Sequence, residues 1–304
     1  MILYIKVMKK YILVTGGAGF VGSNLIEFLL KKTNKKILSL DNYSTGKVSN
    51  HIKSKKIKYL RGNTKQINKL LNTYKNKIDA IFHFGEFARI YQSFNKFDEC
   101  TQSNSYGSRE VFNFCLENKI KLIYSATSAS LGNDEKDKNL SPYAFTKSKN
   151  LELLVNLKKW FGLKYEIIFF YNVYGKKQIE TGDMATVIGI FEYQYRNRLP
   201  LTVVRPGSQS RRFTHISDTV NICYEAWKKN KCKFYSISHK DTYSILDVAK
   251  MFNRKIKYLN KRKGERYASA LTKISHNNKI IKRFGKKSLK DYIASFIKKQ
   301  NLKS

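Results

Sequence analysis

A glycine-rich turn between a strand-like run and a helical pattern is the feature that most constrains the fold of this chain. Residues 15–22 read TGGAGFVG and follow directly on the apolar run Tyr11–Thr15. At the spacing G-x-x-G-x-x-G, the first glycine allows a tight turn, the second lets the backbone approach a pyrophosphate, and the third lets the helix pack on the strand. The helix N-terminus then faces the phosphate charge. The residues predicted to contact such a dinucleotide are Gly16, Gly19, Phe20, Val21 and Gly22.

A carboxylate after the next strand-like run indicates which dinucleotide would bind. Asp41 stands 19 residues after Gly22, directly behind the run 37–40. A carboxylate at this place accepts hydrogen bonds from a ribose diol and repels a 2′-phosphate, which favours NAD over NADP. The alternative is an ordinary turn residue that opens the stretch DNYSTG, but the preceding glycines favour the ribose role. We assign the neighbouring Asn42 to the same cofactor site.

Strand-like and helical patterns alternate through the first half of the chain. Short apolar runs predict strands, and apolar residues at helical spacing predict the helices between them. The predicted strands are Tyr11–Thr15, 37–40, 57–60, 78–82, 121–124 and Tyr165–Phe170, and the predicted helices are 23–31, 106–117 and 141–160. This alternation is typical of parallel βαβ units, so we expect an α/β fold with a Rossmann-type doubly wound parallel sheet that is covered on both faces.

The pattern becomes mixed and rich in loops after about residue 172. We therefore expect an NAD-binding Rossmann domain over residues 1–172 that carries the catalytic residues. A smaller and mainly substrate-binding lobe is expected over residues 173–304, partly interleaved with the Rossmann sheet.

The composition excludes some classes of protein without identifying a partner. Lys and Arg number 59 against 22 Asp and Glu, which gives a formal charge of +37. Either an anionic partner such as nucleic acid or the compositional drift of an AT-rich coding sequence would produce this charge. The basic residues are spread evenly rather than gathered in a stripe, which favours drift over a nucleic-acid partner. Single cysteines and scattered histidines disfavour a disulfide scaffold and a metal site, and no apolar run has the roughly 20 residues of a membrane span.

A second motif predicts redox chemistry on a hydroxyl group. Tyr143 and Lys147 form a Y-x-x-x-K pattern, so that both side chains project from one face of a helix. A nearby ammonium lowers the pKa of a tyrosine, and Tyr143 is then able to take a proton from a substrate hydroxyl as hydride leaves for nicotinamide. The pattern alone arises by chance in a chain rich in Tyr and Lys, but its place at the start of a helix after the fifth strand favours the catalytic interpretation. The hydroxyl-rich stretch YSATSASLG, at 124–132, lies just upstream.

With these motifs the chain resembles the extended short-chain dehydrogenase/reductases, and within them the NAD-dependent nucleotide-sugar epimerase/dehydratase family that includes UDP-glucose 4-epimerase. The similarity begins at about residue 9 and covers nearly the whole chain. The stretches that carry it are TGGAGFVG, DNYSTG, FHFGEFAR, NSYGS at 104–108 (similar to the N-x-x-G-T of the family), SPYAFTK, FYNVYG, LTVVRPGSQSRRF and RKGER.

The resemblance implies a set of site residues. Thr127, Tyr143 and Lys147 match the catalytic residues of the family, and Lys147 also matches the lysine that holds the nicotinamide ribose. The positions matched on the cofactor side are Asn63 and Asn104, and those matched at the sugar nucleotide are Asn172, Arg211 and Arg262. Two guanidinium groups suit a substrate diphosphate because their planar forks pair with phosphate oxygens.

The chain also departs from the pattern of the family. Asn63 stands where Asp is usual, and its amide oxygen is still able to accept a hydrogen bond from an adenine amino group. Gly85 and Glu86 replace two alanines near the cofactor, and Glu86 has no assigned role there. Arg212 replaces an acidic residue, and Lys176-Lys177 replaces Pro-Arg.

The residues after Thr127 discriminate between the reactions of the family. In the 4,6-dehydratases Asp and Glu follow the threonine, and the decarboxylases have Glu at the second position. Here Ser128 and Ala129 take these places, and neither shuttles a proton near neutral pH. The resemblance therefore implies redox-neutral epimerisation of a nucleotide-diphosphate sugar at C4, through a transient 4-keto intermediate and return of the hydride.

Other interpretations remain open. The stretch GDMATV resembles ADP-heptose 6-epimerases, although Thr181 stands at their catalytic lysine and Asp41 disfavours the NADP that they use. A net nucleotide-sugar reductase or dehydratase is a further alternative. Outside the enzymes, the chain would be a cofactor-binding or nucleic-acid-binding protein. The resemblance also suggests a homodimer formed through helices around residues 90–118 and 141–160, and we expect a cytoplasmic location.

Overall fold

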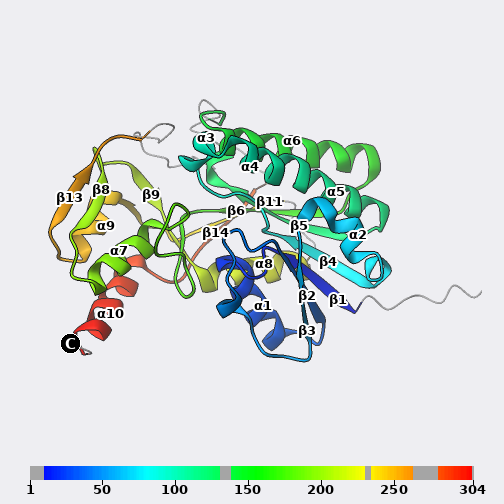
Figure 1. The fold of residues 1–304 in the computed structure, drawn as a ribbon, viewed down its shortest axis with the longest axis horizontal. Coiled ribbons are helices and arrows are strands. Elements are labelled where there is room, and N and C mark those ends of the chain that lie inside the picture. Colours follow the sequence, from blue (N-terminus) through cyan, green and yellow to red (C-terminus); the bar gives the residue numbers. More distant parts are fainter. Residues whose placement is uncertain (1–9, 131–137, 230–233, 263–279, 303–304) are drawn as a thin grey trace, which may run out of the picture.

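A parallel sheet of eight strands forms the centre of the molecule (Figure 1). The computed structural model describes residues 10–130, 138–229, 234–262 and 280–302. The sheet has the order β14-β11-β6-β5-β4-β1-β2-β3, and every neighbouring pair is parallel. Its strands are β1 (Tyr11–Thr15), β2 (Lys36–Asp41), β3 (Ile57–Arg61), β4 (Ile78–His83), β5 (Lys121–Thr127), β6 (Tyr165–Phe170), β11 (Phe234–Ser238) and β14 (Ile280–Phe284).

Helices cover both faces of this sheet. In Figure 1, α1 (Phe20–Lys32) and α8 (Ile216–Lys229) lie on one side of it, and α2 (Ile67–Leu71), α5 (Ser108–Glu117) and α6 (Pro142–Phe161) lie on the other. Because side chains alternate along a strand, Ile12 and Val14 pack with α1 and α8, whereas Leu13 packs with α5 and α6. Strands buried on both faces are apolar at nearly every position, which explains the apolar runs in the sequence.

The strand order reverses direction between β1 and β4. From β1 the chain continues to β2 and β3 on one side, and then returns to add β4, β5 and β6 on the other. In sheets of this kind ligands bind in the crevice beyond the carboxyl ends of the strands at such a reversal. The carboxyl ends of β1, β4 and β5 carry the glycine turn, the loop from Phe84 and Thr127, respectively. The predicted doubly wound parallel fold is confirmed.

A smaller group of elements lies beside the sheet, on the left in Figure 1, around its own apolar cluster. It contains α7 (Val187–Arg196), α9 (Ile245–Met251), α10 (Leu289–Asn301), and the paired strands β8 (Leu201–Val204) with β13 (Ile256–Leu259) and β9 (Ser210–Arg212) with β12 (Thr242–Ser244). Strands β7 (Val173–Tyr174) and β10 (Thr214–His215) form a further pair. The chain also returns from this group to the main sheet, to which it adds β11 and β14.

Short helices connect the larger elements. They are α3 (Gln92–Asn95), α4 (Phe97–Thr101), the π-helical turn η4 (Gln102–Gly107), and the 3₁₀ turns η1 (Val48–Asn50), η2 (Thr64–Gln66), η3 (Lys75–Lys77) and η5 (Ser128–Ser130). The predicted helix 106–117 is therefore the end of η4 followed by α5. Within the described ranges, none of the helices combines the length and apolarity needed to cross a lipid bilayer.

Candidate active site

The turn between β1 and α1 has the geometry that its glycines predict. Gly16 has a φ of +68°, and a Cβ atom there would lie 2.8 Å from the carbonyl carbon of Phe84. A Cβ atom on Gly22 would collide with the carbonyl oxygen of Gly16. Gly19 is the N-cap of α1, and no side chain caps this helix N-terminus or adds an acidic group to its first turn. The N–H groups of the first turn are thus left for an anion, which fits a pyrophosphate.

Asp41 is held against the same turn. Its side chain is buried, with Oδ2 accepting a hydrogen bond from the N–H of Ala18 at 2.9 Å and Oδ1 accepting one from the N–H of Tyr43 at 2.8 Å. The side chain of Asn50 also donates to the carbonyl of Ala18 at 2.9 Å, so residues 41–50 fold back on the turn. Since each carboxylate oxygen accepts more than one hydrogen bond, Asp41 retains acceptor capacity for a ribose diol. Asn42 is exposed beside it and accepts a hydrogen bond from the N–H of Ser44.

The two asparagines predicted on the cofactor side are both engaged with the protein. Asn63 is the N-cap of η2, and its Oδ1 accepts a hydrogen bond from the N–H of Lys65 at 3.0 Å. Asn104 is fully buried, with Oδ1 bound to the N–H of Phe87 at 2.7 Å and Nδ2 donating to the carbonyl of Phe87 at 3.0 Å. The amide of Asn104 thus fixes the loop after β4, and its contact with the cofactor stays a prediction.

The three predicted catalytic residues come from two neighbouring elements. Thr127 ends β5, while Tyr143 and Lys147 occupy the first turns of α6. Thr127 and the phenol of Tyr143 share a hydrogen bond. The N–H of Tyr143 donates to Oγ of Ser93 at 3.2 Å, which fixes the start of the helix against α3. The structure thus brings the threonine and tyrosine together.

The ionisation of Tyr143 differs from the expectation. Burial raises the pKa of Tyr143 to about 12, and the charge of Glu86 adds to this effect, whereas the hydrogen bond from Thr127 and the guanidinium of Arg89 lower the pKa. The ammonium of Lys147, which was expected to lower this pKa, is directed at the carboxylate of Glu86. The expectation of a tyrosine pKa near working pH is thus wrong for the protein without its ligands.

Lys147 lies in a buried ion pair with Glu86. The side chains are 3% and 4% exposed, and Nζ of Lys147 donates to Oε2 of Glu86 and to the carbonyl oxygen of Ser125. The ammonium also lies 4.1 Å from the centroid of the Tyr124 ring. Burial lowers the pKa of Lys147, and the nearby carboxylate of Glu86 opposes this effect. The residue without an assigned role in the sequence is therefore the direct partner of the predicted catalytic lysine.

The predicted substrate residues lie on three separate segments. Asn172, between β6 and β7, has a φ of +25°, is exposed, and donates from Nδ2 to the carbonyl of Arg212 at 2.8 Å. Arg211 is half-buried on β9 and donates to the carbonyl of Ser210. The guanidinium of Arg262 lies 5.4 Å from the centroid of the Tyr91 ring. Arg262 thus reaches the loop after β4. Two parts of the predicted motifs lie outside the described residues, namely 131–132 of the hydroxyl-rich stretch and 263–266 of RKGER.

Arg89 is a further residue of this site that the sequence did not single out. Its guanidinium donates to the carbonyl of Ala88 at 2.8 Å and from Nε to the carbonyl of Met184 at 3.1 Å. It lies close enough to Tyr143 to lower the pKa of the phenol. Glu86 stood out in the sequence as a departure from the pattern of the family. Nothing in the stretch FHFGEFAR, by contrast, distinguishes Arg89 from an ordinary surface charge.

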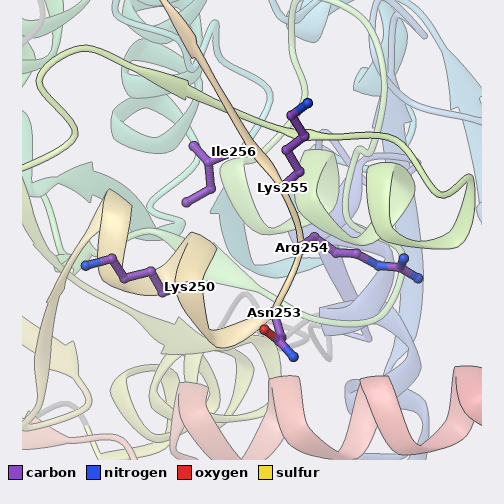
Figure 2. Close-up of a pocket in the computed structure, with 5 residues that line it drawn as sticks. All are labelled: Lys250, Asn253, Arg254, Lys255 and Ile256. Atoms are coloured by element: carbon purple, nitrogen blue, oxygen red, sulfur yellow. The ribbon is translucent and has the colours of Figure 1, made fainter.

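A surface hollow at the junction of α9 and β13 does not form a comparable site. Lys250, Asn253, Arg254, Lys255 and Ile256 line it. Figure 2 shows the charged ends of Lys250, Arg254 and Lys255 pointing in different directions, so they do not gather around one ligand. Among the residues that the structure describes, no group of three or more His, Cys, Asp or Glu side chains is placed to hold a metal ion.

Comparison with known proteins agrees with this geometry. Residues 12–238 match the model of the family described as NAD dependent epimerase/dehydratase. An uncharacterized UDP-glucose epimerase of Bacillus subtilis is 31% identical over 228 residues, which are 69% of this chain and 70% of that protein. A UDP-N-acetyl-alpha-D-glucosaminuronate decarboxylase of Bacillus cytotoxicus is 29% identical over 262 residues, which are 80% of this chain and 79% of that protein.

A solved structure extends the likeness to the whole fold. It is a mutant of the UDP-glucuronic acid 4-epimerase of Bacillus cereus, in complex with NAD and UDP-4-deoxy-4-fluoro-glucuronic acid. The two chains superpose with a TM-score of 0.81 at 25% identity, over 97% of this chain and 100% of that chain.

Proposed function

Because the chain belongs to the NAD dependent epimerase/dehydratase family, we propose that it is an NAD-dependent epimerase that inverts C4 of a nucleotide-diphosphate sugar. The family match confirms the predicted family and the predicted use of NAD. The observation that carries the choice of reaction is the hydrogen-bonded pair of Thr127 and Tyr143, followed by Ser128 and Ala129. With no carboxylate at these two positions, the site lacks the proton relay that elimination or decarboxylation requires.

Each residue of the pair has a distinct task in this reaction. Tyr143 takes the proton of the C4 hydroxyl and gives it back when the ketone is reduced from the opposite face. Thr127 lowers the pKa of Tyr143 through their hydrogen bond and so stabilises the phenolate in a buried place. Bound NAD supplies the hydride acceptor and donor. Because proton and hydride both return to the substrate, the reaction has no net oxidation.

The remaining site residues bind and orient the two ligands. We assign the pyrophosphate of NAD to the uncapped start of α1, at Gly16 to Gly22, and its ribose to Asp41. Asn172 is assigned to the sugar nucleotide, and Arg211 and Arg262 to its diphosphate, since guanidinium groups pair with phosphate oxygens in planar, bidentate geometry. We further divide the chain into a cofactor-binding part over 1–172 and a mainly substrate-binding part over 173–304.

We also propose that the enzyme is a homodimer. Apolar side chains are exposed along α4, η4 and α6 on the outer face of these helices, at Phe97, Tyr106, Phe145 and Val155. Exposed apolar groups on adjacent helices are typical of a surface that a protein partner covers, and a second copy of the chain would cover them by a two-fold contact. A cytoplasmic location is proposed because the described cysteines Cys100, Cys115 and Cys223 are free thiols, as in a reducing compartment.

The test of the proposed function is the conversion of a panel of nucleotide sugars by the purified protein. NMR spectroscopy reports inversion at C4, and mass spectrometry reports loss of water or carbon dioxide. We expect an epimer of unchanged mass from one class of sugar. A product that has lost water or carbon dioxide would assign the protein to another reaction of the family.

The variant Tyr143→Phe tests the assigned base. It removes only the phenolic oxygen, so we expect at least a hundredfold loss of kcat, about the contribution of a general base, with NAD affinity unchanged. Undiminished epimerisation by this variant would contradict the assignment. Tyr193→Phe on α7 is the matched control, because that tyrosine is exposed and we expect its activity to equal that of the native chain.

A further inference from the structure

We propose that Glu86 is a positioning residue that holds the catalytic Lys147 as a fixed, protonated ammonium and thereby sets the pH range of the reaction. The proposal rests on the proposed function and adds to it a residue that the sequence left without a role. It is carried by the contacts of the two side chains and by their burial.

The ammonium of Lys147 has three neighbours that fix its direction. It donates to Oε2 of Glu86 and to the carbonyl of Ser125 at the end of β5, and it lies over the ring of Tyr124. Only 3% of the lysine side chain is exposed. A buried ammonium without a counter-ion either loses its proton or destabilises the fold. Glu86 supplies that counter-ion, and with alanine in its place the lysine would have only neutral partners among these three contacts.

The carboxylate of Glu86 is itself held by three further donors from different elements. Its Oε1 accepts hydrogen bonds from Oγ of Ser108 at 2.8 Å, from the phenol of Tyr124 at 2.9 Å and from Nδ2 of Asn150 at 3.3 Å. Hydrogen bonds to the ionised form keep a buried carboxylate charged. Burial raises the pKa of Glu86, but the charge of Lys147 and the hydrogen bonds from Lys147 and Ser108 are among the effects that outweigh burial, and the pKa lies below its ordinary value. The site is thus built for a carboxylate.

A chain of hydrogen bonds connects this carboxylate to the glycine turn. Oγ of Ser108 lies 3.0 Å from Nε2 of His83, and Nδ1 of His83 lies 2.7 Å from Oγ1 of Thr15, the last residue of β1. Burial lowers the pKa of His83 to about 4, so the ring is neutral at physiological pH. Because Glu86 only accepts, Ser108 donates to it, His83 donates from Nε2 to Ser108, and Thr15 donates to His83. The positions of Lys147 and of the cofactor turn are thereby linked.

Glu86 also acts on the catalytic tyrosine. Its negative charge raises the pKa of Tyr143, while it opposes the fall in the pKa of Lys147 that burial causes. Removing this charge therefore lowers the pKa of both groups. The other titratable groups that face the pair come from β4, the following loop, α4 and β5; they are His83, Arg89, Cys100 and Tyr124. Of these, only Arg89 is charged near neutral pH, since burial keeps His83 neutral and raises the pKa of the thiol and the phenol.

The test is the pH dependence of kcat/KM in Glu86→Gln. In the proposed active form Tyr143 is a phenolate and Lys147 an ammonium, so the ionisations of these two groups bound the active pH range. We expect both limbs of the profile to move to lower pH. The shift should be about one to three units, which is the effect of one nearby charge on a pKa. Glu86→Asp keeps the charge, so its profile should lose height and stay in place. A Glu86→Gln profile of reduced height at the native pH range would show a merely structural role and overturn the proposal.

The matched control is Glu166→Gln. Glu166 on β6 is 3% exposed and forms a buried ion pair with Lys121 at 3.4 Å. Lys121 begins β5, whereas Thr127 ends it. This ion pair therefore lies at the opposite end of the strand from the site. We expect Glu166→Gln to lower stability without moving the pH profile. An equal shift in this control would contradict a local effect of Glu86.

A double-mutant cycle of unfolding tests the ion pair without any substrate. Glu86→Gln and Lys147→Met each leave one buried partner unpaired, while the double variant removes both charges. If the two substitutions acted independently, the decreases in melting temperature of the single variants would add in the double variant. We expect the double variant to melt well above this additive value. If Glu86→Gln fails to fold but the double variant folds, the result shows the same coupling. Additive losses would overturn the proposal, whereas coupling without any epimerisation would overturn only the proposed function.

Discussion

The surroundings of Tyr143, the proposed base, oppose its ionisation. The phenol is buried, its pKa is raised to about 12, and the nearby lysine is neutralised by Glu86. The hydrogen bond from Thr127 and the guanidinium of Arg89 act in the opposite direction. In the proposed reaction, proton transfer would therefore depend on these two groups, and on the positive charge that oxidised NAD would add when bound, rather than on Lys147 alone.

A substitution of Thr127 tests this balance. Thr127→Val keeps the shape and removes the hydroxyl, which raises the pKa of Tyr143. Since the phenolate is the active form, we expect the acid limb of the kcat/KM profile to move to higher pH, opposite in sign to Glu86→Gln. The loss at neutral pH should be about 10 to 100-fold. A profile that keeps its position would show that Thr127 does not assist ionisation.

The convergence of Thr127 and Tyr143 was predictable, but the partner of Lys147 was not. The motifs place both residues near the carboxyl ends of the strands, and the topology of a parallel sheet brings these ends together. Spacing along a helix shows that Tyr143 and Lys147 share a face, yet it does not show what else lies on that face. The direction of Lys147 follows from Glu86, 61 residues earlier in the chain, and such a tertiary contact leaves no local pattern.

Helix α6 combines a polar catalytic half with an apolar half. Tyr143, Lys147 and Asn150 follow one another on the buried face, and Leu154 and Leu157 continue it into the core under the sheet. Ser141 caps the helix by accepting a hydrogen bond from the N–H of Ala144 at 3.1 Å. The core half thus anchors the turns that carry the catalytic groups.

Removing the N-cap of α6 should affect both stability and catalysis. We expect Ser141→Ala to destabilise the fold by about 1 kcal/mol and to lower kcat, because the first turn carries Tyr143. Ser288→Ala removes the N-cap of α10 outside the site and should cost similar stability at unchanged kcat. Calorimetry and steady-state kinetics on both variants measure this; an equal loss of kcat in the two would contradict the link between cap and site.

Among the elements, the sequence predicted those with strong periodicity and missed those without it. The strands β1 to β6 and the helix α6 lie where their apolar runs predict. Strands β11 and β14 were missed because FYSIS is short and interrupted by serines, and IIKRF contains two adjacent charged residues, Lys282 and Arg283. The π-helical turn η4 was also missed, since only its last two residues fall in the predicted helix 106–117 and no local pattern distinguishes a π-helical turn from an α-helix.

At the scale of the molecule, the exposed apolar side chains on α4, η4 and α6 predict the oligomeric state. Phe145→Glu places a charge at the centre of the proposed contact, so we expect the dimer to dissociate to a monomer at micromolar concentration. Leu199→Glu, between α7 and β8, is the control, because Leu199 is equally exposed away from these helices. Light scattering after gel filtration measures the mass. A native chain that is monomeric, or a dimer that persists in Phe145→Glu, would contradict the proposed interface.

The hydrogen-bond chain from Thr15 through His83 and Ser108 to Glu86 also constrains how this sequence can evolve. Glu86 accepts hydrogen bonds from Ser108, Tyr124, Lys147 and Asn150, so replacing it alone by an apolar residue would leave several buried polar groups without an acceptor at once. These positions should therefore be epistatic: each tolerates substitution only in a background where the others have already changed. Replacing Glu86 in a viable descendant would therefore require accompanying changes among the residues that donate to it.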